Sequence, residues 1–280
     1  MSNQSSGVTE TGILKLLVSY DGKAFWGSQR QAGQRTVQGE LEAAAEQVFG
    51  QEIPIYLAGR TDRGVHAAGQ VASFAQPRKV LDSGRIAAAM NDRLGDDIAV
   101  LNVERMPKGF HARYAAHWRE YRYRIWTGVR QQLARGWVWQ LRSSMDIGAM
   151  NRASRALTGE HDFSSFASGG EGVPGSDRRK ARRGARRNVL ACDVRAIERW
   201  WGPPTETGQL IEIRVVADGF LPRMVRGIAG TLAEVGRGTF GEADVATLID
   251  VADRRKAPKN APPDGLVLWA VGYTPFVEER

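Results

Sequence analysis

The stretch that organises this chain is AGRTDRGVHAAGQVASF, residues 58–74. Its first half places one carboxylate, Asp62, between Arg60 and Arg63. An aspartate followed by a glycine two residues later is ordinary turn chemistry, because the side chain accepts hydrogen bonds from nearby N–H groups. The flanking arginines favour a second interpretation, in which the loop lies in a cleft and a guanidinium partner compensates a desolvated carboxylate. These residues alone leave both interpretations open.

Strand patterns lie on both sides of this loop. Residues 53–57 alternate apolar and other side chains, and residues 70–74 combine valine and phenylalanine with small residues. Both patterns are typical of short, half-buried strands. Asp62 is therefore expected on a strand-loop-strand connection, where a rigid scaffold can hold a reactive side chain in place.

The composition is that of an ordinary globular protein. A length of 280 residues is enough for one large domain or two modest ones. The single cysteine, Cys192, excludes an intrachain disulfide and suits a reducing compartment. The polar N-terminus lacks the features of a signal peptide, and no apolar run approaches the ~20 residues of a membrane span. We therefore expect a soluble, cytoplasmic protein that does not contact a membrane.

Positive charge is concentrated in the segment RRKARRGARR, residues 178–187, which holds seven of the basic residues and no acidic one. The basic side chains, candidates for contacts with an RNA backbone, are those of Arg178, Arg179, Lys180, Arg182, Arg183, Arg186 and Arg187. Such a run is often a solvated loop, and residues 169–176 before it resemble a flexible linker. Alternatively, clustered cations bind a phosphate backbone favourably because counterions are released.

The first half of the chain alternates strand and helix patterns. Thr36 is expected to cap a helix that ends at Phe49, with Gly50 as its stop signal. A second helix is expected over residues 83–94. The expected strands are 13–20, 53–57, 70–74 and 98–103. This order of elements is that of a ferredoxin-like unit.

The second half repeats this theme with longer insertions. The expected strands are 119–126, 188–197, 210–216 and 266–272, and the expected helices are 145–157, 222–235 and 242–251. We predict an α+β fold of two ferredoxin-like halves, similar to RNA-recognition domains, with antiparallel sheets side by side and helices on one face. The site would lie in the cleft between the halves. The expected divisions are a disordered lead over 1–11, an N-terminal domain over 12–107, and a C-terminal domain over 108–280 with a basic insertion at 169–187.

The strand that begins at Arg119 carries a second group of candidate site residues. Its period of two places Tyr121 and Tyr123 on one face, and the charged residues between them on the other. The simpler interpretation is a pair of aromatic side chains in the core. The alternative is that Tyr121 stacks on a nucleic-acid base while the arginines bind phosphate.

Arg226 lies away from the apolar stripe of the helix expected over 222–235. Its own face of the helix holds only Gly227, Gly230 and Ala233. Small residues around one arginine indicate that another backbone or a ligand approaches closely there, so we expect Arg226 to be buried and paired.

Several other chemistries lack support in the sequence. The four histidines show no metalloprotease spacing, and one cysteine cannot build a zinc site. There is no phosphate-binding GxxxxGK[ST] loop and no Gly-x-Ser-x-Gly elbow. We therefore expect chemistry by a carboxylate, with no metal and no cofactor.

At these residues the chain resembles the tRNA pseudouridine synthase A family. The resemblance extends from about Leu14 to Tyr273, and the block GRTDRGVH at 59–66 is its most specific part. Other blocks recur in the same order: YDG at 20–22, TVQ at 36–38, FHAR at 110–113, YRY at 121–123, FSSF at 163–166, MVR at 224–226 and GL at 265–266.

The resemblance implies a homodimeric isomerase that binds tRNA and converts uridine to pseudouridine in the anticodon stem-loop, without a cofactor. It also implies a role for each matching residue: Asp62 as the nucleophile, Arg226 as its partner, Tyr121 stacked on the uracil, Arg60 displacing the target base, and Leu266 lining the pocket. Arg63 and His66, in the same block, are expected to contact the substrate.

One alternative function stays open, and one stretch of the sequence departs from the family pattern. A protein that binds RNA through the same cleft without catalysis, as an RNA chaperone would, remains the alternative function. Moreover, where the family commonly has Gly-Trp-Gln, this chain has Gly27-Ser28-Gln29, with Trp26 one position before that glycine. We therefore expect a different packing beneath the first strand.

Overall fold

Strand β1 (Ile13–Tyr20) shows how the sequence builds the sheet. Its even-numbered residues, Leu14 to Tyr20, are buried, and the odd-numbered ones between them are only partly covered. This alternation places one face of the strand against the core. β1 pairs antiparallel with β3 (His66–Ala75) on one side and with β4 (Ile98–Met106) on the other.

The computed structural model describes residues 12–79, 81–168, 184–198 and 208–278. The remaining strands are β2 (Tyr56–Leu57), β5 (Trp118–Gly128), β6 (Trp139–Leu141), β7 (Gly159–Asp162), β8 (Arg186–Ile197), β9 (Gly208–Ala217) and β10 (Leu266–Gly272). Within the described residues the ten strands form one sheet in the order β4-β1-β3-β10-β5-β9-β8-β7, with β2 beside β3 and β6 beside β5.

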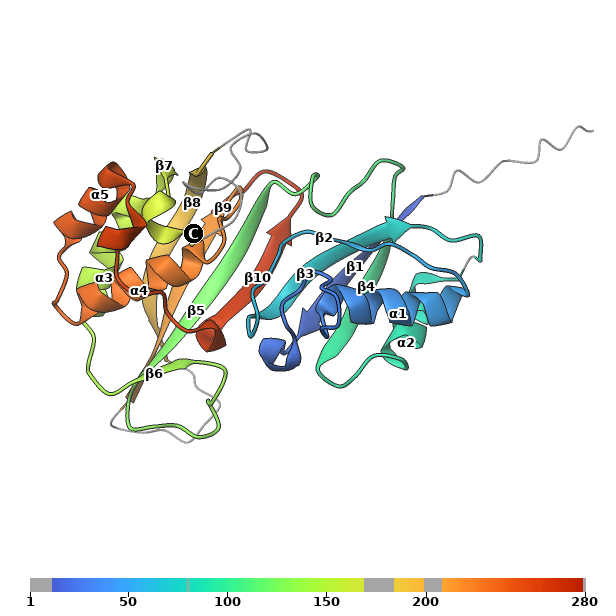
Figure 1. Cartoon of the computed structure of the whole chain (residues 1–280), viewed down its shortest axis with the longest axis horizontal. Coiled ribbons are helices and arrows are strands. Elements are labelled where there is room, and N and C mark those ends of the chain that lie inside the picture. Colours follow the sequence, from blue (N-terminus) through green and yellow to red (C-terminus); the bar gives the residue numbers. More distant parts are fainter. Residues whose placement is uncertain (1–11, 80, 169–183, 199–207, 279–280) are drawn as a thin grey trace, which may run out of the picture.

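The two halves of the sheet meet where β10 lies beside β3 (Figure 1). This contact is parallel and short, with Val267 opposite His66 and Leu268 opposite Ala67. On its other side β10 pairs antiparallel with β5. The last strand of the chain therefore joins the strand that leaves the Asp62 loop to the strand that carries Tyr121.

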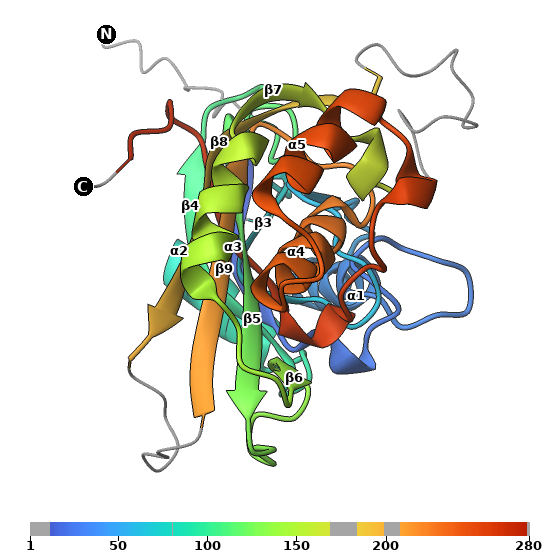
Figure 2. The ribbon, with the colours of Figure 1, turned by 90° about the vertical axis from the view of Figure 1, so that its left-hand side faces the viewer.

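The helices are α1 (Val37–Phe49), α2 (Ser83–Asn91), α3 (Ile147–Ser154), α4 (Met224–Gly236) and α5 (Glu242–Val251). Short 3₁₀ turns are η1 (Gly22–Ala24), η2 (Arg155–Leu157), η3 (Ser164–Phe166), η5 (Arg254–Lys256) and η6 (Pro263–Gly265). Figure 2 shows α1, α4 and α5 on the same side of the strands. The core lies between sheet and helices, because the apolar faces of both are buried there.

The predicted α+β fold is confirmed, with helices on one face and halves side by side. The cap of α1 is also as predicted: the Thr36 hydroxyl accepts a hydrogen bond from the Gly39 N–H, and Gly50 ends the helix at φ 72°. The predicted separation into two sheets is incomplete, because β3 and β10 join them. Strands β6 and β7 were not predicted, and β2 is only two residues long.

The predicted start of α4 at Pro222 was wrong. The helix begins at Met224, after Arg223, which has φ 61°. The carbonyl of Pro222 instead accepts a hydrogen bond from the Ser168 N–H, and the Met224 N–H bonds the Leu221 carbonyl. The chain thus turns sharply before the helix, and Arg226 lies in its first turn.

The sheet face opposite the helices carries charge in the C-terminal half. As predicted from its period, β5 turns Tyr121 and Tyr123 into the core and Glu120 and Arg122 to the other face. On that face the buried carboxylate of Glu212 lies within 3.4 Å of Arg122, Arg124 and Arg195. No helix in the described residues is long and apolar enough to cross a membrane.

Candidate active site

The Asp62 loop runs from the end of β2 to the start of β3, and its first residues are fixed by Gln70. The buried Gln70 amide donates a hydrogen bond to the Gly59 carbonyl (2.8 Å) and accepts one from the Gly59 N–H (3.2 Å). Because Gln70 lies on β3, this clamp ties the loop to the rigid strand that follows it.

Thr61, the residue before the aspartate, is held from two further segments. Its N–H donates to the Ser28 hydroxyl (2.8 Å), and its carbonyl accepts from the Ser28 N–H (3.0 Å). Its own hydroxyl lies 2.8 Å from the Tyr20 hydroxyl at the end of β1. Burial raises the pKa of Tyr20 to about 12, so this phenol stays neutral at physiological pH. Few degrees of freedom remain for Asp62 itself.

The loop closes as a turn against the C-terminal half of the molecule. The Val65 N–H donates to the Asp62 carbonyl (3.1 Å), and Gly64 has φ 80°. A side chain at this glycine would lie 3.1 Å from the Pro263 ring. Gly64 is thus needed both for its backbone conformation and for close packing against η6.

Arg226 reaches Asp62 from α4 on the other side of the junction. Its Nη1 lies 3.6 Å from Oδ2 of Asp62, and its Nε donates a 2.7 Å hydrogen bond to the Ala261 carbonyl. The Ala261 N–H in turn donates to the Arg226 carbonyl. The Arg226 side chain is 16% exposed and that of Asp62 is 38% exposed. The carboxylate is therefore paired but only partly desolvated.

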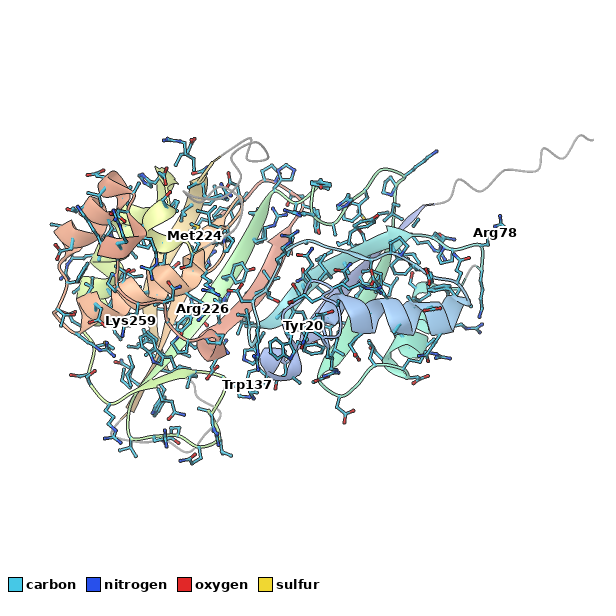
Figure 3. The ribbon with its side chains drawn as sticks, in the orientation of Figure 1. Tyr20, Arg78, Trp137, Met224, Arg226 and Lys259 are labelled. Atoms are coloured by element: carbon cyan, nitrogen blue, oxygen red, sulfur yellow. The ribbon has the colours of Figure 1, made fainter. Side chains whose placement is uncertain are left out.

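The expected close approach of another backbone at Arg226 is confirmed. A Cβ added to Gly227 would lie 2.3 Å from the Phe166 carbonyl oxygen, and one added to Gly230 would lie 2.1 Å from that of Lys259. Gly227 thus leaves room for the backbone of Phe166, and Gly230 lets residues 259–261 lie directly on α4. This contact brings the Ala261 carbonyl to the Arg226 guanidinium. Figure 3 shows Arg226 and Tyr20 at the junction, each on its own half.

Tyr121 is buried beside the loop, opposite Leu268 of β10. Its hydroxyl donates to the Arg60 carbonyl (3.3 Å), and its ring meets the edge of Phe220 at 4.9 Å between centroids. Burial raises the Tyr121 pKa above its usual range, and the nearby Tyr20 and the Asp62 carboxylate act in the same direction. The core-facing interpretation of Tyr121 is confirmed, and its stacking on a base stays a prediction.

The other candidates in the motif lie at different depths. Arg60 and Arg63 are both exposed. The ion pair that Asp62 forms among the described residues is with Arg226, and neither flanking arginine takes part in it. The Arg63 guanidinium lies over the indole of Trp26, 3.7 Å from the ring centroid. Leu266 is buried opposite Tyr123 of β5, on the same face as Leu268.

His66 is buried and both of its ring nitrogens contact the backbone. Nδ1 accepts from the Gly22 N–H (3.1 Å), and Nε2 lies 2.9 Å from the Gly136 carbonyl. The ring stacks on Trp137 with 4.4 Å between centroids. Burial lowers the His66 pKa, although the nearby Asp21 carboxylate opposes this effect. The imidazole thus links the start of β3 to the connection between β5 and β6.

Most of the basic segment falls outside the described residues, including Arg178, Arg179, Lys180, Arg182 and Arg183. The last two basic residues lie at the start of β8. Arg186 forms an exposed ion pair with Glu160, at 3.0 Å. Arg187 lies against Gly219, since a Cβ there would be 3.7 Å from its side chain, and Gly219 precedes the Phe220 that contacts Tyr121.

A pocket of about 370 Å³ lies beside the site rather than over it. Its lining includes Arg130 and Arg135 from the connection between β5 and β6, and Pro262 and Asp264 from the segment after Ala261. Asp62 is not part of this lining. The Asp62 side chain is 38% exposed, so solvent reaches the carboxylate outside this pocket.

The sequence did not identify several residues that build the site. Ser28 and Gln70 anchor the Asp62 loop through hydrogen bonds. Phe220 packs against the Tyr121 ring, and Leu268 lies with the Tyr121 hydroxyl beside Gly59. The Ala261 carbonyl accepts a hydrogen bond from Arg226. These residues act through hydrogen bonds and packing between distant segments, for which a sequence pattern gives no signal. The exception is Ala261, since the glycines of α4 indicated that some backbone would lie there.

Fold and site together define an α+β protein with a carboxylate-centred site at the junction of two halves. The family model described as tRNA pseudouridine synthase matches residues 16–115 and 153–274. Relatives named tRNA pseudouridine synthase A include that of Geobacillus kaustophilus, 40% identical over 94% of this chain and 95% of the relative, and that of Anoxybacillus flavithermus, 38% identical over 93% and 98%. That of Thermosipho africanus is 39% identical over 90% of this chain and 96% of the relative. The chain belongs to the tRNA pseudouridine synthase family.

Proposed function

We propose that this protein is an isomerase that converts uridine to pseudouridine in the anticodon stem-loop of tRNA, with Asp62 as the nucleophile and without a cofactor. The observation that carries the proposal is the Asp62–Arg226 pair, 3.6 Å apart, beside the buried Tyr121. The names of its curated relatives support the same activity.

The reaction is an isomerisation, and the site needs only to rearrange bonds. The bond between ribose C1′ and uracil N1 breaks, the freed base turns, and a new bond joins C1′ to C5. The C5 proton is lost and N1 takes up a proton, so substrate and product have the same composition. Asp62 acts as a nucleophile at C1′ or on a path through a glycal, and in both cases a carboxylate must lie within reach of the ribose.

Arg226 orients the carboxylate before the substrate arrives. An aspartate is ionised at neutral pH without assistance, so the guanidinium is needed to fix its direction and to keep it charged when RNA excludes water. The bond from Arg226 Nε to the Ala261 carbonyl leaves Nη1 directed at Asp62. Such preorganisation lowers the cost of reaching a reactive geometry.

The remaining candidates act on the base. A uridine stacked in a helix must leave the stack to reach Asp62, at a cost of a few kcal/mol. We propose that Arg60 occupies the space it leaves, that Tyr121 packs on the flipped uracil, and that Leu266 closes the pocket floor. The raised Tyr121 pKa keeps its hydroxyl protonated, which suits a packing role better than that of a base at C5.

Release of tritium from tRNA labelled at uracil C5 tests the proposal. The wild-type protein is expected to release tritium, and Asp62→Asn is expected to abolish release while the circular dichroism spectrum stays native. Asp96→Asn, which removes an exposed carboxylate from a turn before β4, is the matched control and should retain activity. Appreciable turnover by Asp62→Asn would overturn the assignment of the nucleophile. RNA binding without any new nucleoside in wild-type digests would favour the non-catalytic alternative.

We also propose that the basic segment binds the tRNA backbone. Arg187 at its end lies against Gly219, next to the loop that carries Phe220, so RNA held there would pass close to Tyr121. Replacing the basic residues of 178–187 by glutamine should flatten the dependence of log Kd on log salt, by about 0.7–0.9 per lost phosphate contact. If the slope of log Kd against log salt were unchanged, the segment would be a solvated loop that does not contact the RNA.

The protein is further proposed to act in the cytoplasm, where tRNA is processed, and as a homodimer. We propose that the second copy packs on the charged face of the C-terminal half-sheet, where Glu212 pairs with three arginines. Light scattering should give a mass of twice 30.8 kDa. A mass of 30.8 kDa at micromolar concentration would contradict the dimer.

A further inference from the structure

One exposed tryptophan lies directly beside the Asp62 loop. The Trp26 side chain is 43% exposed, and the guanidinium of Arg63 covers its ring at 3.7 Å. Arg63 follows Asp62 in the chain and is itself exposed. We call this pair the Trp26–Arg63 shelf. Its outer surface is the free face of a flat cation, one residue from the proposed nucleophile.

The shelf is fixed to the catalytic loop by backbone contacts. Two residues after Trp26, Ser28 exchanges hydrogen bonds of 2.8 and 3.0 Å with Thr61. Between them, Gly27 has φ 98°, and a Cβ at this position would lie 3.0 Å from the Thr61 carbonyl oxygen. Trp26 therefore keeps its position relative to Asp62 without relying on side-chain contacts alone.

The shelf carries a positive charge that no described carboxylate pairs with. Among the described residues, no carboxylate lies within the 4.0 Å ion-pair distance of Arg63, whereas Asp62 is paired with Arg226. A surface arginine that serves only solubility has no reason to lie over an indole. A planar guanidinium held over an aromatic ring is positioned to stack on a second planar group.

We propose that the Trp26–Arg63 shelf stacks an unpaired RNA base next to the uridine that enters the Asp62 site. This inference rests on the proposed function, since flipping the uridine removes a stacking partner from its neighbours. Arginine planes and aromatic rings both stack on unpaired bases, and such stacking tolerates any base because each has a π-face. The shelf thus replaces the stacking contact that the flipped uridine gave up, and it binds the neighbouring nucleotide whichever base that nucleotide carries.

A simpler role for Arg63 would be a point contact with phosphate. The two roles differ in what Arg63→Lys does, because lysine keeps the charge and loses the plane. They also differ in the part that Trp26 plays. A phosphate contact is independent of the indole, whereas a stack depends on both members of the shelf.

Binding of a synthetic anticodon stem-loop RNA to the full-length protein distinguishes these roles. We expect Trp26→Ala to raise the Kd about tenfold, Arg63→Lys to raise it by a similar factor, and Trp26→Phe to restore most of the affinity. The double variant should be little weaker than either single variant, because both changes remove the same stack. Tyr114→Ala is the matched control: it removes an exposed aromatic ring that also carries an arginine, Arg113, and it should leave the Kd unchanged.

Two results would overturn the shelf. One is a Kd for Trp26→Ala within about twofold of wild type in a protein with native circular dichroism. The other is full affinity in Arg63→Lys, which would make Arg63 a phosphate contact. These failures are separable from failure of the proposed function, because wild-type tritium release is measured on the same RNA. If the wild type releases tritium and the variants bind RNA as tightly as it does, the shelf proposal is wrong and the isomerase proposal stands. If the variants bind more weakly but the wild type releases no tritium, the isomerase proposal is wrong and the shelf proposal stands.

The stacked nucleotide can also be located. Abasic replacements on either side of the target uridine remove one base at a time and leave the backbone in place. When the missing base is the one that normally stacks on the shelf, the abasic RNA should bind the wild-type protein as weakly as it binds Trp26→Ala. If every abasic RNA retained the full difference between the two proteins, no flanking base would lie on the shelf, and the proposal would be wrong.

Discussion

The two sides of the site are held in place by different physical means. On the N-terminal side, hydrogen bonds from Gln70 and Ser28 to the backbone of Gly59 and Thr61 fix the Asp62 loop. On the C-terminal side, Arg226 is positioned by the packing of residues 259–261 on Gly230 of α4. The first side depends on individual polar groups, and the second depends on the absence of side chains.

This difference determines how each side should respond to mutation. A lost hydrogen bond leaves one buried group unsatisfied, at a cost of about 1–3 kcal/mol, while the loop keeps its other anchors. An added methyl group on α4 must displace a backbone segment and, with it, the carbonyl that holds Arg226. We therefore expect the C-terminal side to be the more fragile of the two.

The largest effect is expected from changing the charged group that spans the junction. Arg226→Lys keeps the charge but cannot contact the Ala261 carbonyl and the Asp62 carboxylate with the same planar fork. Misplacement of a catalytic group by about 1 Å can cost 10²-fold, so we expect tritium release to fall at least about 100-fold. Single-turnover rates at saturating tRNA measure this effect. A rate near that of wild type would show that charge alone is sufficient.

A smaller effect is expected from Gly230→Ala. The new Cβ would lie 2.1 Å from the Lys259 carbonyl oxygen, so the segment must move away from α4. We expect a loss of about 1–3 kcal/mol in the free energy of unfolding and a reduced rate, because the Ala261 anchor moves with it. Urea denaturation and tritium release provide the two measurements. Gly84→Ala in α2, where the new Cβ would make only an ordinary 3.5 Å contact, should change neither by much.

The sequence was sufficient for the elements whose causes are local. The strand over 13–20 was predicted, and a capping threonine with a terminal glycine predicted both ends of α1. The small residues around Arg226 predicted the close approach of another backbone or a ligand, and the structure shows that it is a backbone. The location of Asp62 on a loop between strands followed from the flanking strand patterns.

Features that depend on distant segments were not accessible. The parallel contact of β10 with β3 involves only two residue pairs and leaves no pattern in either strand. The positive φ of Arg223, which delays the start of α4, accompanies a hydrogen bond from the Ser168 N–H to the Pro222 carbonyl, and these residues are far apart in the chain. No local pattern identifies the partner of Asp62, because Arg226 lies far along the chain; the resemblance to the family implied this pair, and the structure places the two side chains 3.6 Å apart.

The smallest expected effect concerns pH and again compares the two sides, because His66 links them. Its pKa is lowered in the folded protein chiefly by burial, with Lys23 acting in the same direction and Asp21 opposing. A lowered pKa means that the unfolded chain binds more protons just below its own pKa of about 6.5, so stability should rise with pH through that window and level off above it. Each unit of difference between the two pKa values contributes about 1.4 kcal/mol.

His66→Gln, which cannot titrate, isolates this contribution. Urea midpoints measured between about pH 5 and pH 8 should show the wild type losing stability relative to the variant as the pH falls below about 6.5. If the difference between the two proteins were constant across this range, the imidazole would have the same pKa folded and unfolded. If the wild type instead gained stability toward low pH, the Asp21 carboxylate would outweigh burial, and His66 would join the two sides as a charged group rather than a neutral one.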